Sequence, residues 1–192
     1  MANYRFAPGA ATAYLAVFRE EGLPLVTRHL PLLGYWLTEC GRLNVLHHLW
    51  VYADLDDRAA RRAALAADTD WSAGFGPRAF PMIERQESLL LVLRNGSRRL
   101  SDAVATPREP RAAVPGDAPL LAPSWAMLEL SDDAPAAPGA AETTGLWQVI
   151  AGRRCASHLA LFHAAKAGDV TPPDRPALLR ELLRPATFSP LR

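Results

Sequence analysis

The sequence LGYWLTECGRLNVLHHLWVY, residues 33–52, decides the fold of the first half of the chain. It contains two apolar runs, Leu33–Cys40 and Leu43–Tyr52, separated by Gly41-Arg42. Aromatic and β-branched side chains favour strands, and a glycine between two such runs is typical of a hairpin turn. The stretch therefore predicts two antiparallel strands joined by a tight turn.

Helices are expected on both sides of this hairpin. Ala10–Phe18 has an apolar helical face, and Pro24 can begin a second short helix because proline at the first helical position loses no helical hydrogen bond. An alanine- and arginine-rich helix is expected over Arg58–Ala67, with Asp56 or Asp57 as its N-cap. The hairpin should therefore pack against a helical layer.

Two further strands complete the same unit. Ala2–Phe6 precedes the first helix, and Ile83–Leu93 follows a broken helical stretch over Trp71–Met82. The resulting order is strand, helix, strand, strand, helix, strand, which is the ferredoxin-like arrangement. Residues 1–96 therefore predict one complete α+β unit.

A diverged copy of this unit is expected in the second half of the chain. Residues 97–123 are polar and proline-rich, which predicts a linker or a long surface loop. Residues 124–192 then repeat three features of the first hairpin. Gly34-Tyr35-Trp36 corresponds to Gly145-Leu146-Trp147, Gly41-Arg42 to Gly152-Arg153, and His47-His48-Leu49 to Ser157-His158-Leu159. The sequence thus predicts two tandem repeats, the second with eroded helices.

Several short motifs are spaced along the first unit. They are Glu20-Glu21-Gly22-Leu23-Pro24, Arg28-His29, Leu33-Gly34-Tyr35, Glu39, Gly41, Leu43-Asn44, His48-Leu49-Trp50, Asp54-Leu55, Arg58 and Gln86-Glu87-Ser88. Together they resemble the NIPSNAP family, and the C-terminal Leu183–Pro185 and Phe188–Leu191 resemble the end of the family's domain. The sequence departs from the family in its short first strand and in Gly74-Phe75-Gly76-Pro77, which interrupts the second helix.

The resemblance implies an α+β fold in which ferredoxin-like units pair into a dimeric α+β barrel. Two copies in one chain could pair with each other, or each could pair across the interface of a homodimer. Proteins of this superfamily include cofactor-independent oxygenases, isomerases, haem-degrading enzymes and non-enzymatic members. The resemblance therefore implies a fold and a dimer but no single reaction.

Composition and charge exclude several classes of protein. The 192 residues include 21 Lys and Arg against 20 Asp and Glu, a net charge of +1, which gives no support to electrostatic capture of nucleic acid or of an acidic membrane. Cys40 and Cys155 are far apart in the sequence, which favours a reduced, cytoplasmic protein without disulfides. No run reaches the roughly 18 apolar residues of a transmembrane helix. We therefore expect a soluble cytoplasmic protein. Lys166 is the only lysine and alanine is abundant, a bacterial-like composition that indicates a GC-rich genome.

Alternation along the second hairpin strand identifies the main catalytic candidate. One face carries Val45, His47, Leu49 and Val51, and the other carries Asn44, Leu46, His48, Trp50 and Tyr52. The second face mixes polar and aromatic groups, so it is expected to line the barrel interior if the first packs on the helices. His48 could then act as a general acid or base, because histidine titrates near neutral pH. The alternative is a hydrogen-bonded structural histidine beneath a dimer interface.

Arg28 and Glu39 are the other two catalytic candidates. The resemblance implies that Arg28 and His29 lie near the barrel mouth, where the guanidinium could hold a carboxylate or an enolate. A salt bridge from Arg28 to Glu20, Glu21 or Glu39 is the structural alternative. Glu39 could act as a base or could orient Arg28.

The candidate substrate-binding residues are mostly aromatic. They are Asn44, Trp36, Trp50, Tyr52 and His29. Their rings could stack on a flat ligand, and core packing is the structural alternative. No metal is expected, because the adjacent His47 and His48 point to opposite faces of a strand. No other cofactor is expected either, since Walker A, GxGxxG, HExxH and GxSxG motifs are absent.

Two hypotheses about function follow. In the first, the protein binds a small hydrophobic or aromatic metabolite in an α+β barrel and could convert it without a cofactor, by proton transfer, cyclisation, isomerisation or oxygenation. In the second, it is a non-enzymatic dimeric interaction or assembly module whose barrel is filled by its own side chains. Haem binding through a single histidine is a third and weaker hypothesis. The sequence leaves open whether the protein is an enzyme.

Overall fold

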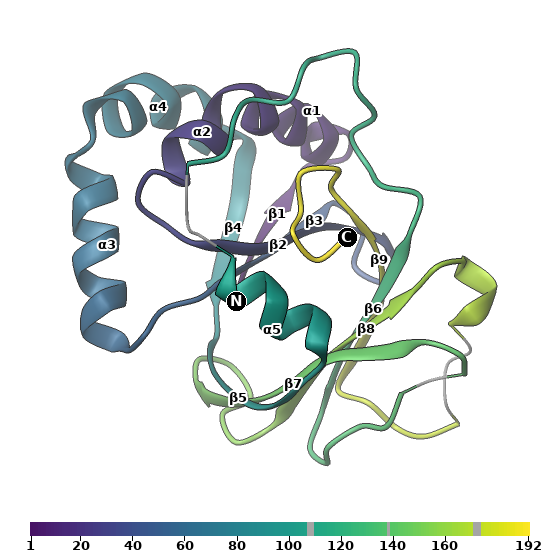
Figure 1. Cartoon of the computed structure of the whole chain (residues 1–192). Helices are drawn as coiled ribbons and strands as arrows, with labels where there is room; N and C mark the ends of the chain where they lie inside the picture. The colour runs from purple at the N-terminus through teal and green to yellow at the C-terminus, as the bar shows by residue number, and fades with distance from the viewer. Residues whose placement is uncertain (107–109, 138, 171–173) are drawn as a thin grey trace.

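An antiparallel sheet of nine strands runs through both halves of the chain in the computed structural model, which describes residues 1–106, 110–137, 139–170 and 174–192 (Figure 1). The strands are β1 (Ala2–Phe6), β2 (Leu32–Cys40), β3 (Val45–Trp50), β4 (Ile83–Ser88), β5 (Leu90–Gly96), β6 (Trp125–Ser131), β7 (Glu142–Ala151), β8 (His158–Ala164) and β9 (Leu179–Pro185). Together with the helices they confirm the expected α+β class.

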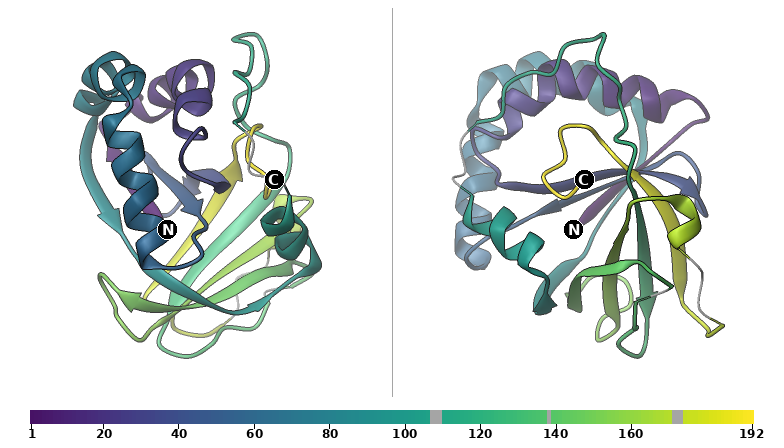
Figure 2. Two further views of the ribbon diagram at one scale, coloured as in Figure 1. Left: turned by 60° about the vertical axis from the view of Figure 1, so that its left-hand side comes forward. Right: turned by 45° about the vertical axis from the view of Figure 1, so that its right-hand side comes forward.

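The helices lie mainly between the strands of the first half. α1 (Ala10–Val17), the π-helical η1 (Phe18–Gly22) and α2 (Leu23–Val26) connect β1 to β2, and α3 (Leu55–Ala67), η2 (Asp70–Phe75), α4 (Gly76–Ala79) and η3 (Phe80–Met82) connect β3 to β4. The short helix α5 (Arg98–Ala105) follows β5, and η4 (Ala167–Asp169) follows β8. Helices α1–α4 cover one face of β1–β4 (Figures 1 and 2). Within the described ranges, no helix is long and apolar enough to cross a membrane.

The same strand order occurs twice in the sheet. The full order is β4-β1-β3-β2-β9-β6-β8-β7-β5. When the strands of each half are numbered one to four along the chain, both β4-β1-β3-β2 and β9-β6-β8-β7 give the order four, one, three, two. The first block is the arrangement expected for a ferredoxin-like unit.

The two edge strands of the sheet are consecutive in the chain. Only Leu89 separates β4 from β5, and the Leu89 amide donates a 2.8 Å hydrogen bond to the carbonyl of Met1. β4 pairs with β1 at one end of the order, while β5 pairs with β7 at the other. The sheet therefore curves so that one nearly continuous segment joins its two edges (Figure 2).

The two faces of the sheet carry different cores. The helix-side core combines Tyr14 and Phe18 with sheet residues such as Leu46. The inner core joins both halves and includes Trp36 of the first half and Trp147 of the second. Burial of a large apolar side chain stabilises the fold by about 1.5–3 kcal/mol. The inner core thus holds the two halves of the sheet together.

Equivalent glycine and tryptophan residues mark β2 and β7. The Trp36 ring lies over Gly34, and the Trp147 ring lies over Gly145, so that a Cβ atom on either glycine would overlap the ring. In both strands the register shifts immediately before this glycine. These two glycine–tryptophan pairs are the ones aligned from the sequence. The turn of each hairpin also contains a glycine at positive φ, 115° at Gly41 and 105° at Gly152.

Three sequence-based expectations about local structure differ from what the structure shows. The single strand expected over Ile83–Leu93 is two strands, β4 and β5, which lie at opposite ends of the sheet order. The N-cap of α3 is Asp54, whose side chain accepts a hydrogen bond from the Asp57 amide, so the helix begins before both expected caps. The expected linker contains α5, which begins after an N-cap at Ser97 and buries Leu100 in the inner core. A serine cap and one apolar anchor allowed a helix within a polar, proline-rich stretch.

Candidate functional site

A cavity of about 270 Å³, called here the helix-side cavity, lies between the helices and the sheet of the first half. It is lined by Tyr4, Tyr14, Phe18, Val26, Leu30, Tyr35, His48, Trp50, Arg62, Leu65, Ala66, Trp71, Phe80 and Gln86. Its walls are mostly aromatic and apolar and carry a few polar groups. Such a lining is typical of a site for a small organic molecule.

The β3 face that carries His48 packs on the helices. Leu46, on the same face, belongs to the core that contains Tyr14 of α1, whereas Leu49, on the opposite face, packs with Leu161 of the second half. The expected orientation of the two faces was therefore wrong. Both faces of β3 are buried, so the sequence alternation separates them without showing which one meets the helices.

Three aromatic rings surround His48, which is buried. Its ring centroid lies 4.6 Å from that of Tyr4 and 5.4 Å from that of Tyr35, which stacks nearly parallel to it. Trp50 lies edge-on with its centroid at 5.7 Å. Tyr4 on β1 and Tyr35 on β2 flank the histidine because β3 lies between these strands in the sheet.

A hydrogen bond fixes the protonation of His48. The indole Nε1 of Trp50 donates to Nδ1 of His48 at 2.5 Å. Indole nitrogen can only donate, so Nδ1 accepts and the proton of the neutral imidazole lies on Nε2. Burial above all, with added repulsion from positive groups including Arg62, lowers the pKa of His48 to about 3. His48 is therefore neutral at physiological pH.

The Nε2 atom of His48 is buried and has no hydrogen-bond partner among the residues that the structure describes. The Tyr35 hydroxyl is also buried and makes no well-formed hydrogen bond within these residues, although Tyr14 is close enough to affect its titration. Burial raises the pKa values of Tyr4, Tyr14 and Tyr35, so their phenols stay protonated. Unpaired buried donors are uncommon and costly in folded proteins.

A larger cavity of about 390 Å³ borders α5 and the inner face of the sheet. Its walls include Leu33, Leu49 and Trp147 together with the exposed end of α3. Trp50 and Arg62 border both cavities. Each cavity borders a buried polar atom without a hydrogen-bond partner in the described residues, the Tyr52 hydroxyl in the larger cavity and His48 Nε2 in the helix-side cavity. The larger cavity is lined mostly by aliphatic side chains and the helix-side cavity mostly by aromatic ones, so the latter is the better candidate site for an aromatic ligand.

The expected binding residues are divided among several places. Trp50 lines both cavities and Tyr52 lines the larger one. Trp36 is fully buried in the inner core, and Asn44 lies in the hairpin turn with φ of 58°; neither lines these two cavities. Glu39 is exposed near the end of β2 and lines neither cavity. The structure therefore brings Trp50 to His48 but not Trp36, Asn44 or Glu39.

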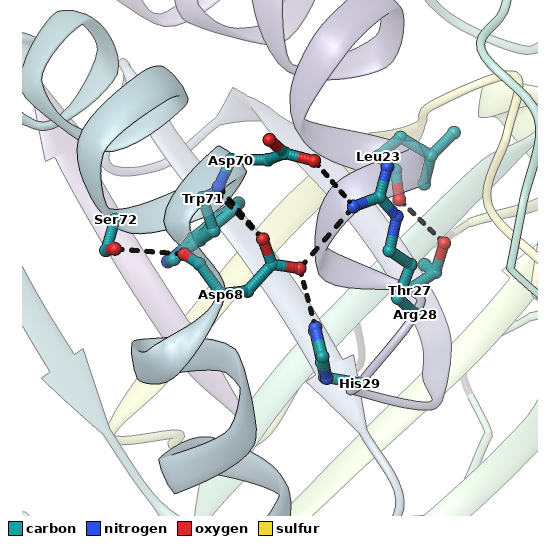
Figure 3. Close-up of polar contacts among 8 residues, drawn as sticks. All are labelled: Leu23, Thr27, Arg28, His29, Asp68, Asp70, Trp71 and Ser72. Carbon is teal, nitrogen blue, oxygen red and sulfur yellow. Dashed lines mark hydrogen bonds and ion pairs between the residues drawn. The ribbon is translucent and has the colours of Figure 1, made fainter.

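Arg28 and His29 form a polar cluster outside the cavity (Figure 3). Arg28 Nη1 lies 2.9 Å from Asp70 and 3.5 Å from Asp68, and His29 Nε2 lies 2.8 Å from Asp68. Asp68 also accepts hydrogen bonds from the amides of Asp70 and Trp71. Arg28 thus forms a salt bridge, as the structural alternative supposed, but with aspartates in place of the expected glutamates. The cluster connects the end of α2 to the start of η2.

The other histidine of the adjacent pair, His47, faces the inner side of the sheet. Its Nε2 lies 2.9 Å from Glu181 of β9, and Arg42 Nε lies 2.8 Å from the same carboxylate. Burial alone would raise the pKa of Glu181, but its close contact with His47 and the hydrogen bonds from Arg42 outweigh burial and lower it to about 2. This ion cluster joins the two halves where β2 pairs with β9. Across the described ranges, no three His, Cys, Asp or Glu side chains form a group that could hold a metal ion.

Several residues of the helix-side cavity were missing from the sequence-based candidates. Tyr4 and Gln86 pair across β1 and β4, and Tyr14 and Arg62 come from α1 and α3. The apolar face expected for Ala10–Phe18 included Tyr14 but did not distinguish a cavity wall from a core residue. Only the packing of helices on the sheet brings these side chains to His48.

Comparison with known proteins places the first half in one family. The NIPSNAP family profile matches residues 1–98, just over half of the chain. Human NipSnap homolog 3A is 35% identical over 92 residues, which cover 47% of this chain and 37% of that protein. Mouse NipSnap homolog 3B is 34% identical over 86 residues, 44% of this chain and 34% of that protein. The matched region spans only about a third of these relatives.

Solved structures of bacterial NIPSNAP proteins each match about half of the chain. An uncharacterized NIPSNAP domain protein from Burkholderia xenovorans is 41% identical, covers 47% of this chain and 88% of its own, and has a TM-score of 0.46. A NIPSNAP family protein from Agrobacterium tumefaciens is 38% identical, covers 50% of this chain and 92% of its own, and also has a TM-score of 0.46. On the match of the family profile to residues 1–98, the chain belongs to the NIPSNAP family.

Proposed function

We propose that this NIPSNAP protein binds a small, hydrophobic or aromatic organic molecule in the helix-side cavity. The observation that carries the proposal is the pairing of an aromatic cavity with a buried, unpartnered donor at His48. An apolar ligand would fill the space between the sheet and helices α1 and α3. A polar atom on the ligand would satisfy the donor that the protein leaves unpaired.

The size of the cavity limits the ligand. About 270 Å³ lies just below the usual range of roughly 300–1,000 Å³ for ligand pockets. This space suits a compound with one or two fused rings. Phe18, Tyr14 and Trp71 supply flat apolar walls against which such rings can pack.

The barrel expected from the family resemblance is proposed to close within one chain. The last strand of each half pairs both within its own half and with the other half. β9 pairs with β6 of the second half and with β2 of the first. The β4–β5 segment pairs with β1 of the first half and with β7 of the second. The equivalent glycine–tryptophan pairs in β2 and β7 also support two tandem repeats. On this proposal, closure of the sheet needs no second copy, and a homodimer would use another surface.

The alternative, a non-enzymatic assembly module, has support of its own from the inner face of the sheet. Trp36, Trp147 and leucines from both halves fill part of that space beside the larger cavity, as the alternative supposes for the barrel interior. The two functions differ over the helix-side cavity, which an assembly module would not need. A test must therefore address this cavity.

Blocking the cavity from α3 separates the two functions. Ala66 lines the cavity and is exposed, so Ala66→Trp places a ring at its wall without disturbing the core, and the exposed Ala63 of the same helix provides the control Ala63→Trp. We expect native mass spectrometry of the purified protein to show a monomer, and equilibrium dialysis with naphthol to show one bound equivalent. Ala66→Trp should weaken naphthol binding at least about tenfold, roughly 1.4 kcal/mol, and Ala63→Trp should leave it unchanged.

Two results would contradict the proposal. If wild-type protein neither retains a small molecule nor binds naphthol, the assembly module is the better description. If Ala66→Trp binds naphthol as tightly as wild type, any binding occurs outside the helix-side cavity.

A further inference from the structure

We infer that His48 serves as a neutral hydrogen-bond donor to the ligand, and that the helix-side cavity selects an aromatic compound bearing an acceptor oxygen such as a ketone carbonyl. This inference rests on the proposed function and specifies the ligand class of the same site. It gives His48 a donor role in place of the acid or base role expected from the sequence.

The first step of the argument is the direction of the Trp50 hydrogen bond. Trp50 and His48 lie two residues apart on β3, so both side chains project from the same face of the strand. The indole N–H occupies Nδ1 at 2.5 Å and leaves the imidazole proton on Nε2. A base would need a free lone pair facing the ligand, but the lone pair of this ring is already used by Trp50.

The second step is the absence of an acceptor for Nε2 in the described residues. Among the described residues, the cavity lining contains no carboxylate, and its possible acceptors, three tyrosine hydroxyls and the amide oxygen of Gln86, make no hydrogen bond to Nε2. Arg62 carries positive charge and cannot accept a hydrogen bond. Nε2 is buried without a partner, so an acceptor supplied by a ligand would remove the cost of leaving this donor unpaired.

The third step concerns the rigidity and polarity of the site. Stacking on Tyr35 and edge contact with Tyr4 restrict rotation of the imidazole ring. A fixed neutral imidazole N–H can polarise a carbonyl, as in enzymes that stabilise an enolate. The surrounding phenols stay protonated, so the cavity favours a neutral carbonyl oxygen over a cationic ligand.

A pair of isosteric probes tests the inference. Acetylnaphthalene and isopropenylnaphthalene have the same shape, but only the ketone has an acceptor oxygen. Equilibrium dialysis should show that wild-type protein binds the ketone about 3- to 10-fold more tightly, the range expected for one hydrogen bond. His48→Phe should bring this ratio to about one, and His48→Gln, which keeps an N–H donor, should retain much of it.

A second pair of variants tests the role of Trp50. Trp50→Phe removes the indole donor, so that the proton of His48 is no longer fixed on Nε2. The preference for the ketone over the alkene probe should therefore fall. Trp71→Phe changes another tryptophan of the cavity wall that makes no side-chain hydrogen bond to His48, and it should keep the wild-type ratio. Thermal unfolding of every variant checks that it remains folded.

The outcomes separate this inference from the proposed function. If wild-type protein binds both probes equally, or if His48→Phe keeps the preference for the ketone, the inference is wrong while the binding site stands. If neither probe binds, the proposed function itself fails. If Trp50→Phe keeps the full preference for the ketone and Trp71→Phe loses it, Trp50 does not fix the proton of His48 on Nε2.

Discussion

The outer face of β1–β4 is covered by helices α1–α4, whereas the connections on the outer face of β6–β9 contain no α-helix in the described residues. On that second face, residues such as Met127 and Phe162 are covered by short segments that include Val170. Two pockets on the second half, one near His163 and the other near Arg175, have no Phe, Tyr or Trp among their described lining residues. The two halves thus share a strand order and differ in what lies over it.

This difference separates the requirements of the sheet from those of the site. Strand order and cross-pairing suffice to curve the sheet, because both halves keep them. The aromatic helix-side cavity also needs helices that leave a space above the sheet and bring residues such as Tyr14 and Arg62 near His48. Three sets of substitutions test how far the halves are alike, and the contact between the halves where β2 pairs with β9 should show the largest effect.

Glu181→Gln should cause the largest loss of stability, because it removes the anion shared by His47 of β3 and Arg42 of the β2–β3 turn. Removing one partner of a buried ion pair costs about 3–5 kcal/mol, and we expect about 3 kcal/mol in urea unfolding at pH 7. Glu39→Gln, at an exposed position, is the control and should change stability little.

The effect of Glu181→Gln should depend on pH. The folded-state pKa of Glu181 is lowered from 4.5 to about 2, so its ionised form stabilises the fold fully above pH 4.5. That contribution is lost as pH falls through 2. The difference between wild type and Glu181→Gln should therefore shrink from pH 7 to pH 3. A constant difference in stability between pH 7 and pH 3 would show that the charge of Glu181 does not stabilise the contact between the two halves.

Gly34→Ala and Gly145→Ala compare equivalent positions in the two halves. Each new methyl group would overlap a tryptophan ring, and overpacking a core costs about 1–3 kcal/mol. The loss of stability caused by Gly34→Ala should lie at the upper end of this range because Trp36 is fully buried. The loss caused by Gly145→Ala should be smaller because Trp147 is 6% exposed.

Gly168→Ala is the control for this pair, since no atom of the described residues other than its chain neighbours lies within 4 Å of the added Cβ. Its effect on the denaturation midpoint should be small. A neutral Gly145→Ala beside a costly Gly34→Ala would show that the second half does not pack its tryptophan as the first does.

Asp68→Ala should have the smallest effect and should be confined to the helical layer of the first half. It removes the acceptor for the Asp70 and Trp71 amides at the start of η2, and loss of such a cap costs about 1 kcal/mol. Asp68→Asn keeps an acceptor oxygen and should cost less. Hydrogen exchange should quicken in α2 and η2 and stay unchanged in β6–β8. Faster exchange in β6–β8 would mean that the helical layer supports the second half as well.

Much of the local structure could be predicted from residue patterns. Gly41-Arg42 between two apolar runs predicted the β2–β3 hairpin, and the helix over Arg58–Ala67 lies within α3. The alignment of Gly34–Trp36 with Gly145–Trp147 identified positions that pack alike. These predictions succeeded because turns, helix periodicity and close glycine contacts depend on neighbours a few residues away.

Most of the site could not be predicted in the same way. Arg28 forms its salt bridge with Asp68 and Asp70, some forty residues away, rather than with the nearer glutamates. α5 formed within a proline-rich stretch because Leu100 gains a place in a core shared by both halves. Long-range partners of this kind are set by packing and leave no periodic pattern in the sequence.

The sequence by itself determined membership in the NIPSNAP family, the positions of the main strands and the candidacy of His48. Only the tertiary structure decided that His48 faces the helices while His47 faces Glu181 of the other half. The physical reason is that β3 is buried on both sides, so alternation distinguishes two faces but gives neither of them a partner. The partners come from the helices above the strand and from the second half below it.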